Sequence, residues 1–288
     1  MSTPEPIIHR RSLCIDGMRT SFLEAGDGDP VVLLHGGEFG AAAEFAWERI
    51  IPLLAPSRRV IAPDVLGFGD SAKIVDFADG RGFRTRHVAA LLRTLGIGRA
   101  DFVGNSMGGV MLLVDGTSSS PALDVRRMVV ICGGGEILDN EHSAALYDYD
   151  GSFKAMRRIV HALFHDPSFA ADEEYVRRRW ESSIRPGAWE AVASARFRRP
   201  GHVSSGGSEP DYARLAVPTL VIEGERDKLK PTGWSTLLAD ALPHARALIA
   251  AGAGHCPQIE HPERTAREIL DFLDADEPLT TPQSRETP

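Results

Sequence analysis

The stretch Phe102-Val103-Gly104-Asn105-Ser106-Met107-Gly108-Gly109 decides the fold of this chain. An apolar run ends in a short glycine-rich turn, and a serine stands at the tip of that turn. We expect strand, sharp turn and helix here, because a Gly-x-Ser-x-Gly pattern in that setting imposes strained dihedral angles on the serine. Gly104 and Gly108 permit the close backbone packing that such a turn needs. Ser106 would then begin a helix, where N–H groups and the helix dipole favour negative charge.

The pattern is short, so a glycine-rich turn without chemistry is the alternative interpretation. A serine hydroxyl is a poor nucleophile unless a base takes its proton, and the oxyanion it creates needs N–H donors. The functional interpretation therefore requires a base, an acid and an oxyanion site at the same edge of the predicted sheet.

The composition is that of one large globular domain. The chain has 288 residues, of which 43% are hydrophobic and 25% are charged. This length suffices for a substantial core and leaves room for an inserted subdomain. The formal net charge is −8, and no basic tract is long enough to follow a phosphate backbone. We therefore expect no nucleic-acid partner.

No targeting or membrane segment is predicted. Met1–Arg11 is polar and lacks the apolar centre of a signal peptide, and no apolar run approaches the ~20 residues of a membrane helix. Cys14, Cys132 and Cys256 are scattered and odd in number, which fits neither a disulfide framework nor a metal site. We expect a cytoplasmic protein without membrane association, metal or cofactor.

Short β-type runs alternate with helical patterns, which predicts an α/β fold with a mostly parallel sheet between two layers of helices. The predicted strands are Ile7–Cys14, Arg19–Ala25, Val31–Leu34, Arg59–Ala62, Asp101–Val103, Arg127–Ile131, Pro218–Glu223 and Ala245–Ala250. The predicted helices of this part are Glu44–Leu54, Phe83–Leu95 and Glu263–Leu273.

The alternation stops in residues 135–211, where Arg, Glu, Ala and aromatic residues predict several short helices. We interpret this stretch as an inserted helical cap that ends in the Gly/Ser-rich linker His202–Pro210. A helical subdomain with no role at the site is the alternative. Residues 1–134 and 212–275 would form the two parts of the core, and residues 276–288 a flexible tail.

His255 is the predicted base among ten histidines. It ends the glycine-rich loop Ala251-Gly252-Ala253-Gly254-His255 after a late strand, and loops at strand ends are where the sites of α/β sheets gather. Imidazole titrates near neutral pH, so it can take and return the serine proton. A loop histidine that contacts only solvent is the alternative.

Asp227 is the predicted acid that orients the imidazole. The strand that ends near Glu223 continues into Gly224-Glu225-Arg226-Asp227, so Asp227 lies one short turn beyond it. Glu223 and Glu225 are the fallback candidates. The predicted triad then has the chain order serine, aspartate, histidine.

The oxyanion hole needs two backbone N–H donors. Met107, the residue after the nucleophile, is expected to supply one. Gly37 in the loop His35-Gly36-Gly37-Glu38 is expected to supply the other, because it follows Val31–Leu34 directly and has no side chain to block a substrate oxygen. A simple turn is the alternative for this loop.

Taken together, these segments resemble the α/β-hydrolase superfamily over nearly the whole chain outside the tail. The resemblance implies a mostly parallel eight-stranded sheet flanked by helices, with an inserted helical cap. The segments that carry it are Leu33-Leu34-His35-Gly36-Gly37, Pro63-Asp64-Val65-Leu66-Gly67-Phe68-Gly69-Asp70-Ser71, Gly104-Asn105-Ser106-Met107-Gly108-Gly109, Gly224-Glu225-Arg226-Asp227 and Gly254-His255.

Within the superfamily, Val103–Gly109 is similar to the meta-cleavage-product hydrolases, which cleave a carbon–carbon bond in diketo acids derived from ring-opened aromatics. That family carries a cap arginine, followed by tryptophan, that binds the dienoate end of the substrate, and Arg179-Trp180 resembles the pair. The residues at which substrate contact is expected are Gly36, Asn105, Arg179, Trp180 and Cys256.

The helical pattern points to Arg179 independently. On a helix, Arg179 falls in the arc of Tyr175, Val176 and Trp180, whereas Arg178 points away. A guanidinium on an apolar face needs an anionic partner. A substrate carboxylate and a buried Glu or Asp both fit that requirement.

Two positions depart from the meta-cleavage-product hydrolases. Cys256 follows the predicted base where that family usually has tryptophan, and Ala46 stands where it has asparagine. In that family both residues shape the pocket around the polar end of the substrate. Their absence here leaves the identity of the substrate undetermined.

Three functions are therefore carried forward. The first is a serine hydrolase that cleaves a carbon–carbon bond in a diketo acid, the second an ester or lactone hydrolase, and the third a non-catalytic ligand-binding protein. The expected partner is a small organic molecule, for which an anionic character is one option. The sequence leaves the oligomeric state open, and a homodimer is one of the alternatives.

Overall fold

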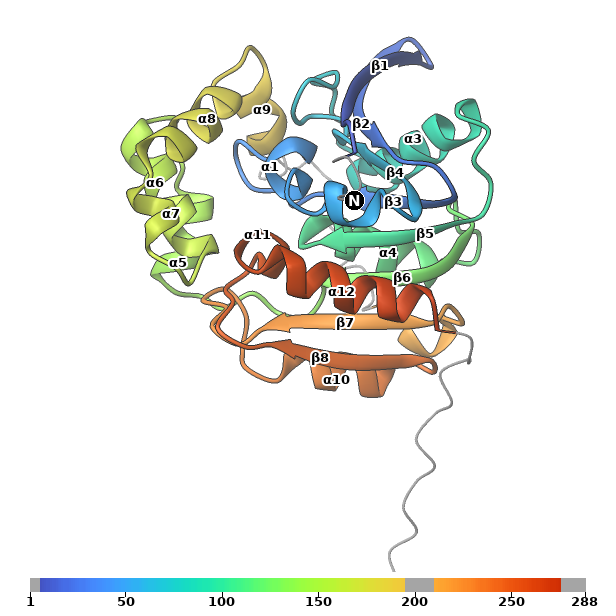
Figure 1. Cartoon of the computed structure of the whole chain (residues 1–288). Helices are drawn as coiled ribbons and strands as arrows, with labels where there is room; N and C mark the ends of the chain where they lie inside the picture. The colour runs from blue at the N-terminus through green and yellow to red at the C-terminus, as the bar shows by residue number, and fades with distance from the viewer. Residues whose placement is uncertain (1–5, 195–209, 276–288) are drawn as a thin grey trace, which may run out of the picture.

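An eight-stranded sheet forms the centre of the protein, in a computed structural model that describes residues 6–194 and 210–275 (Figure 1). Its strand order is β1-β2-β4-β3-β5-β6-β7-β8. β2 is antiparallel to β1 and β4, and all other neighbours are parallel. This confirms the predicted fold class. The strands are β1 (His9–Ile15), β2 (Met18–Ala25), β3 (Asp29–Leu34), β4 (Arg58–Pro63), β5 (Ala100–Asn105), β6 (Val125–Ile131), β7 (Thr219–Gly224) and β8 (Ala245–Ala250).

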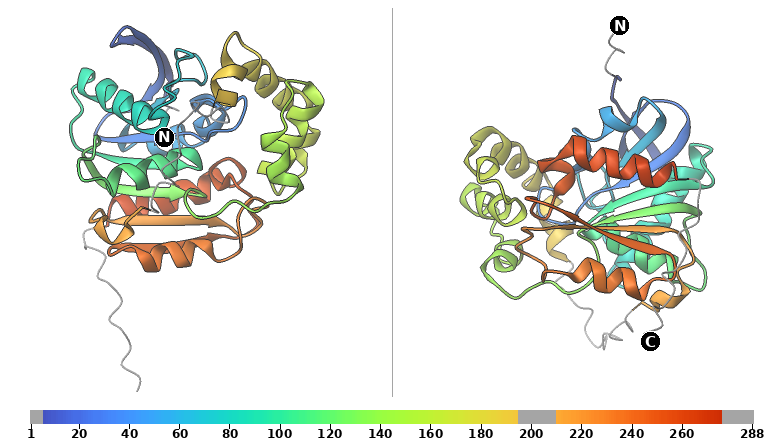
Figure 2. Two further views of the ribbon diagram at one scale, coloured as in Figure 1. Left: turned by 180° about the vertical axis from the view of Figure 1, so that it is seen from behind. Right: turned by 60° about the horizontal axis from the view of Figure 1, so that its bottom comes forward.

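Helices cover both faces of this sheet. α2 and α12 pack together on one face, and α3, α4 and α10 cover the other (Figure 2). These core helices and their neighbours are α1 (Ala43–Trp47), α2 (Ile51–Leu54), α3 (Gly80–Thr94), α4 (Met107–Gly116), α10 (Trp234–Ala241), α11 (Pro257–Glu260) and α12 (Pro262–Leu273). Among the described residues, no helix combines the length and apolar character needed to cross a membrane.

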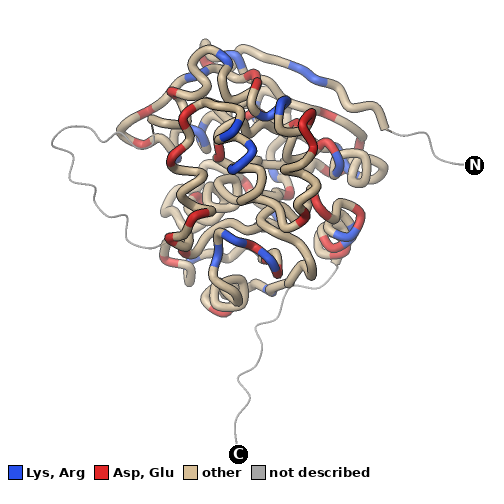
Figure 3. Tube along the Cα trace, turned by 90° about the vertical axis from the view of Figure 1, so that its left-hand side faces the viewer, with Lys and Arg blue, Asp and Glu red and all other residues tan. Residues whose placement is uncertain are grey.

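A separate helical layer follows β6 and lies beside the carboxyl ends of the parallel strands (Figure 1). Figure 3 views the molecule from the side on which this helical layer lies, and acidic and basic residues are interspersed over the described part of the chain. Within the predicted cap, residues 195–209, which include most of the predicted linker, lie outside the described residues, as does the predicted tail 276–288. The helices of this layer are α5 (Glu141–Tyr147), α6 (Phe153–Leu163), α7 (Ser168–Ala171), α8 (Glu173–Ser183) and α9 (Ala188–Ala193).

The single helix predicted over Glu44–Leu54 is wrong, because this stretch forms the two short helices α1 and α2. Pro52 stands in the first turn of α2, where a missing N–H is tolerated. Inside one continuous helix the same proline would remove a hydrogen bond and clash with the preceding turn. The chain instead forms a tighter turn between the two helices, where the Ile50 N–H donates to the carbonyl of Trp47, three residues earlier, at 2.9 Å.

The turn from β5 into α4 is packed against backbone on both sides. Ser106 at its tip has φ 49° and ψ −112°. A Cβ atom at Gly104 would lie 2.5 Å from the backbone of Gly108, and one at Gly108 would collide with the carbonyl of Leu34 on β3. The two glycines therefore let α4 approach the sheet closely enough to hold the serine in its strained conformation.

Gly104→Ala should lower the free energy of unfolding by ~2–3 kcal/mol, because backbone atoms must shift to admit the methyl group. Gly98→Ala is the matched control, since a Cβ atom there would meet no atom within 4 Å. Urea denaturation followed by circular dichroism measures both variants. Equal stability of the two would contradict the close packing of the turn.

Candidate active site

Ser106 borders a cavity of ≈ 630 Å³ at the carboxyl end of β5. Its backbone is tied on both sides, because its N–H donates to the Ile131 carbonyl at 2.8 Å and its carbonyl accepts the Val110 N–H at 3.0 Å. The side chain is partly exposed. The hydroxyl therefore belongs to a rigid turn that opens onto space large enough for a small organic molecule.

His255 borders the same cavity and is hydrogen-bonded to Asp227. His255 Nδ1 and Asp227 Oδ2 are 2.7 Å apart, and Asp227 Oδ1 accepts the Leu229 N–H at 2.8 Å. Burial would raise the pKa of Asp227, but the charge and hydrogen bond of His255 outweigh it, so that the pKa lies below its usual range. An ionised carboxylate at this distance is placed to accept a hydrogen bond from Nδ1, and the role of Nε2 as the base for Ser106 stays a prediction.

The two fallback acids are engaged elsewhere. Glu223 accepts hydrogen bonds at the start of α10, among them the Gly233 N–H at 2.8 Å. Glu225 accepts the Gly252 N–H at 2.9 Å. Asp227 is therefore the acid that the fold brings to the histidine.

The loop after β3 places Gly37 against Met107. Both residues border the cavity, and a Cβ atom at Gly37 would lie 2.9 Å from the Met107 side chain. His35 fixes the loop, because its Nε2 accepts the Val65 N–H at 3.0 Å and its Nδ1 donates to the Gly36 carbonyl at 2.6 Å. Burial lowers the pKa of His35, which keeps the ring neutral. The two residues predicted to form the oxyanion hole thus lie together, and their donor role stays a prediction.

The lining of the cavity combines aromatic rings with charged side chains. Its phenylalanines are Phe39, Phe68, Phe77 and Phe83. Its arginines and lysine are Arg81, Arg84 and Lys230, and its acids are Glu38 and Asp76. Sequence reasoning missed Arg81 and Arg84 of this lining, because nothing in a local pattern shows which face of α3 meets the turn at Ser106.

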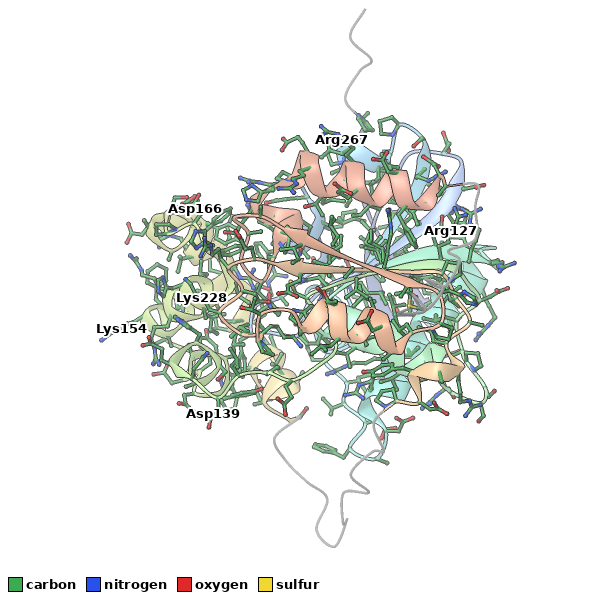
Figure 4. The ribbon with its side chains drawn as sticks, turned by 90° about the horizontal axis from the view of Figure 1, so that it is seen from below. Arg127, Asp139, Lys154, Asp166, Lys228 and Arg267 are labelled. Atoms are coloured by element: carbon green, nitrogen blue, oxygen red, sulfur yellow. The ribbon has the colours of Figure 1, made fainter. Side chains whose placement is uncertain are left out.

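The loops that carry the acid and the base are fastened to α6. The His255 N–H donates to the Leu163 carbonyl at 2.8 Å. Lys228 Nζ donates to the carbonyls of His161 and Phe164 at 2.8 and 2.9 Å, and Figure 4 shows Lys228 beside this helical layer. The layer α5–α9 is therefore attached to the loops that carry Asp227 and His255.

Arg179 is buried on α8 and forms an ion pair with Glu38 of the loop after β3. Its Nη2 contacts Glu38 Oε1, and its Nη1 donates to the Tyr175 hydroxyl at 3.3 Å. Burial would raise the pKa of Glu38, but the charge and hydrogen bond of Arg179 lower it below its usual range. Of the two anionic partners left open by the sequence, the structure contains the internal carboxylate.

The residues predicted to contact substrate lie outside the lining of the ≈ 630 Å³ cavity: Gly36, Asn105, Arg179, Trp180 and Cys256. Asn105 Nδ2 donates to the carbonyls of His255 and Ile131, each at 3.2 Å, and its Oδ1 lies 3.9 Å from Cys256 Sγ. Trp180 Nε1 donates to the Gly151 carbonyl at 2.9 Å. Asn105 thus links the end of β6 to the loop of His255, and direct contact of all five residues with substrate stays a prediction.

Cys132 lies next to Asp227 and His255, which the sequence did not indicate. It follows β6 with φ 49° and borders the cavity. Among the described residues, its Sγ forms with Asp227 and His255 a group whose potential ligand atoms all lie within 4.8 Å of one another. Burial raises the pKa of the Cys132 thiol. Of this group, His255 Nδ1 and Asp227 Oδ2 are hydrogen-bonded at 2.7 Å, which is the arrangement expected of a base and the acid that orients it.

Asp227→Asn should lower kcat by about 10⁴ while the protein stays folded, because the amide favours the wrong imidazole tautomer. Glu225→Gln is the matched control, since it removes a nearby carboxylate that bonds to Gly252. Steady-state hydrolysis of a p-nitrophenyl ester measures both. A near wild-type kcat for Asp227→Asn would show that the acid lies elsewhere.

Glu38→Gln should reduce the free energy of unfolding by about 3–5 kcal/mol, because it leaves the Arg179 guanidinium buried without its anion. The double variant Glu38→Gln/Arg179→Met should recover much of that loss. Urea denaturation at pH 7 measures both. A single variant as stable as the wild type would contradict the role of the ion pair.

The same pair has a predicted pH dependence. Because the pKa of Glu38 is lowered in the folded state, its contribution to stability is present above the ordinary glutamate pKa and is lost as the pH falls through the folded-state value. The wild type should therefore lose stability more steeply in acid than the double variant does. Parallel stability profiles would contradict this expectation.

Comparison with known sequences agrees with this geometry. Residues 31–268 match the family described as "Alpha/beta hydrolase family". The chain is 36% identical over 267 residues to a 2-hydroxymuconate semialdehyde hydrolase of a Pseudomonas species, covering 91% of this chain and 93% of that protein. It is 34% identical over 264 residues to the 2-hydroxy-6-oxo-6-(2'-aminophenyl)hexa-2,4-dienoic acid hydrolase of Metapseudomonas resinovorans, covering 89% and 88%.

A solved structure gives the same result. The 2-hydroxy-6-oxo-6-phenylhexa-2,4-dienoate hydrolase of a Rhodococcus species aligns with a TM-score of 0.82 at 27% identity, covering 94% of this chain and 100% of that one. The resemblance drawn from the sequence is confirmed. The chain is a hydrolase that belongs to the α/β-hydrolase family.

Proposed function

We propose that this protein is a serine hydrolase that cleaves a carbon–carbon bond in a 2-hydroxy-6-oxo-dienoate. The observation that carries the proposal is the placement of Ser106 and of the His255–Asp227 pair at one cavity of ≈ 630 Å³. The names of the relatives, which act on 2-hydroxymuconate semialdehyde and on dienoates with a 6-oxo group, support this bond and this substrate class.

The first chemical step is ketonisation of the dienol. The 2-hydroxyl group loses a proton, and the carbon next to the 6-oxo group gains one. The bond to be broken then joins a saturated carbon to a carbonyl carbon, and the fragment beyond it is a conjugated ketone that can accept an electron pair. His255 is the base that we assign to this proton transfer, because it borders the cavity and is oriented by Asp227.

Cleavage follows by nucleophilic attack. Ser106 adds to the 6-oxo carbon while His255 takes its proton, and the N–H groups of Gly37 and Met107 stabilise the oxyanion. Collapse of the adduct breaks the carbon–carbon bond, whose electron pair passes into the conjugated ketone, and the protonated fragment leaves as a 2-hydroxy-dienoate. One water, deprotonated by His255, then hydrolyses the acyl-serine ester and releases the second acid.

The layer α5–α9 acts in this proposal as a lid that excludes bulk water, which is the role expected for the cap of residues 135–211. Tyr147, Leu163 and Val192 from α5, α6 and α9 border the cavity and support this role. Closure by apolar side chains would protect the carbanionic fragment from untimely reaction with solvent.

The proposed setting is the cytoplasm, with a carboxylate-bearing substrate. The three cysteines are free, which fits a reducing compartment. The arginines and lysine of the cavity favour an anionic molecule over a neutral one. A homodimer stays a prediction, which sedimentation velocity would test.

Steady-state assays on 2-hydroxy-6-oxohepta-2,4-dienoate and on p-nitrophenyl butyrate test the proposed bond. The dienoate should have the higher kcat/KM, and Ser106→Ala and His255→Ala should each remove most of the rate without adding to one another. Ser194→Ala is the matched control, because it removes a hydroxyl from the same cavity that donates to the Ala191 carbonyl. Hydrolysis of the ester alone would contradict carbon–carbon cleavage.

A further inference from the structure

Arg84 lies in the cavity beside the residue that follows the nucleophile. It comes from α3, and its Nη1 lies 3.9 Å from Met107 Sδ. Its Nε donates to the Leu66 carbonyl at 3.1 Å, and its guanidinium carbon is 5.2 Å from the centre of the Phe68 ring. The hydrogen bond to Leu66, the weaker one to Met107 Sδ and the Phe68 ring thus fix the guanidinium near the predicted oxyanion hole, and three of its five N–H groups stay available.

No described carboxylate neutralises this cation. Within residues 6–194 and 210–275, Arg84 takes part in no ion pair, and burial is the cause that lowers its pKa. The two acids of the cavity are engaged elsewhere, because Glu38 pairs with Arg179 and Asp76 accepts the Ala78 N–H at 2.7 Å. A partly buried guanidinium without an anion is a costly arrangement unless a ligand supplies the anion.

The other buried cations near the cavity have their partners. Arg179 lies outside the lining and is neutralised by Glu38. Lys230 Nζ contacts the Gly134 carbonyl and donates to the Gly135 carbonyl at 3.3 Å. Arg84 therefore differs from both, because it lines the cavity and has no anionic partner among the described residues, where its acceptors are the Leu66 carbonyl and Met107 Sδ.

We propose that Arg84 binds a carboxylate group of the substrate. This inference rests on the proposed function, and it assigns the carboxylate of that substrate class to Arg84 instead of Arg179. The planar guanidinium can donate two parallel hydrogen bonds to a carboxylate, which fixes direction as well as charge. A carboxylate held there lies next to Met107, so the same contact orients the reacting carbonyl toward Ser106.

The first test is equilibrium binding to Ser106→Ala protein, which is measured without turnover. The ligands are 2-hydroxy-6-oxohepta-2,4-dienoate and its neutral methyl ester, and calorimetry gives both dissociation constants. Arg84→Gln should reduce the preference for the acid over the ester by about 10–100-fold, as expected for lost charge-assisted hydrogen bonds. Arg84→Lys, which keeps the charge but loses the planar fork, should give an intermediate preference.

Arg86→Gln is the matched control for the loss of charge. Arg86 lies on the same helix, pairs with Asp79 at 2.7 Å and is absent from the lining of the cavity. It should leave the preference for the acid unchanged. Equal effects of Arg84→Gln and Arg86→Gln would overturn the proposal, as would a preference that only Arg179→Gln abolishes.

A second test separates failure of this inference from failure of the proposed function. With Ser106 intact, p-nitrophenyl hydrogen glutarate and p-nitrophenyl valerate form an anionic and a neutral ester of matched length. If the dienoate is not cleaved, the ratio of kcat/KM for these two esters still reports on Arg84. A ratio that favours the anion and falls in Arg84→Gln supports the inference, and a ratio that is the same in wild type and variant overturns it.

Discussion

At Ser106 the backbone turns with a positive φ, and this turn is the constraint on which the rest of the site depends. The conformation is unfavourable for a serine and persists because Gly104 and Gly108 admit backbone contacts that a side chain would block. The same packing brings α4 under the end of β5 and places Met107 against Gly37. Ser106, the loop that contains Gly37 and the start of α4 are thus positioned by the same local packing.

The loops around this turn are held by charges and hydrogen bonds that cross from the core to the helical layer. The buried pair Glu38–Arg179 ties the oxyanion loop to α8, and the loop of His255 is bonded to the end of α6. Because of these contacts, a movement of the layer α5–α9 would also displace the loops that carry Glu38 and His255. Preorganisation of this kind is what the proposed function requires of groups that stabilise developing charge.

Local sequence patterns were sufficient to predict most of the fold and the pairing of Asp227 with His255. Short apolar runs that end in glycine-rich turns located the strands, and Asp227 and His255 could be predicted because each follows the end of a strand. Pairing between distant segments could not be predicted in this way, since Glu38 and Arg179 are 141 positions apart. Arg84 was missed for the same reason, because an amphipathic helix pattern does not show which side chains reach a cavity formed by other segments.

The central claim is that Ser106 is a nucleophile activated by His255. Labelling with a fluorophosphonate, followed by peptide mass mapping, tests it most directly, because the reagent phosphonylates an activated serine. The account predicts one adduct on the peptide that contains Ser106, and loss of labelling in folded His255→Ala protein. A folded wild-type protein that takes no label, or takes it on another residue, would contradict the account.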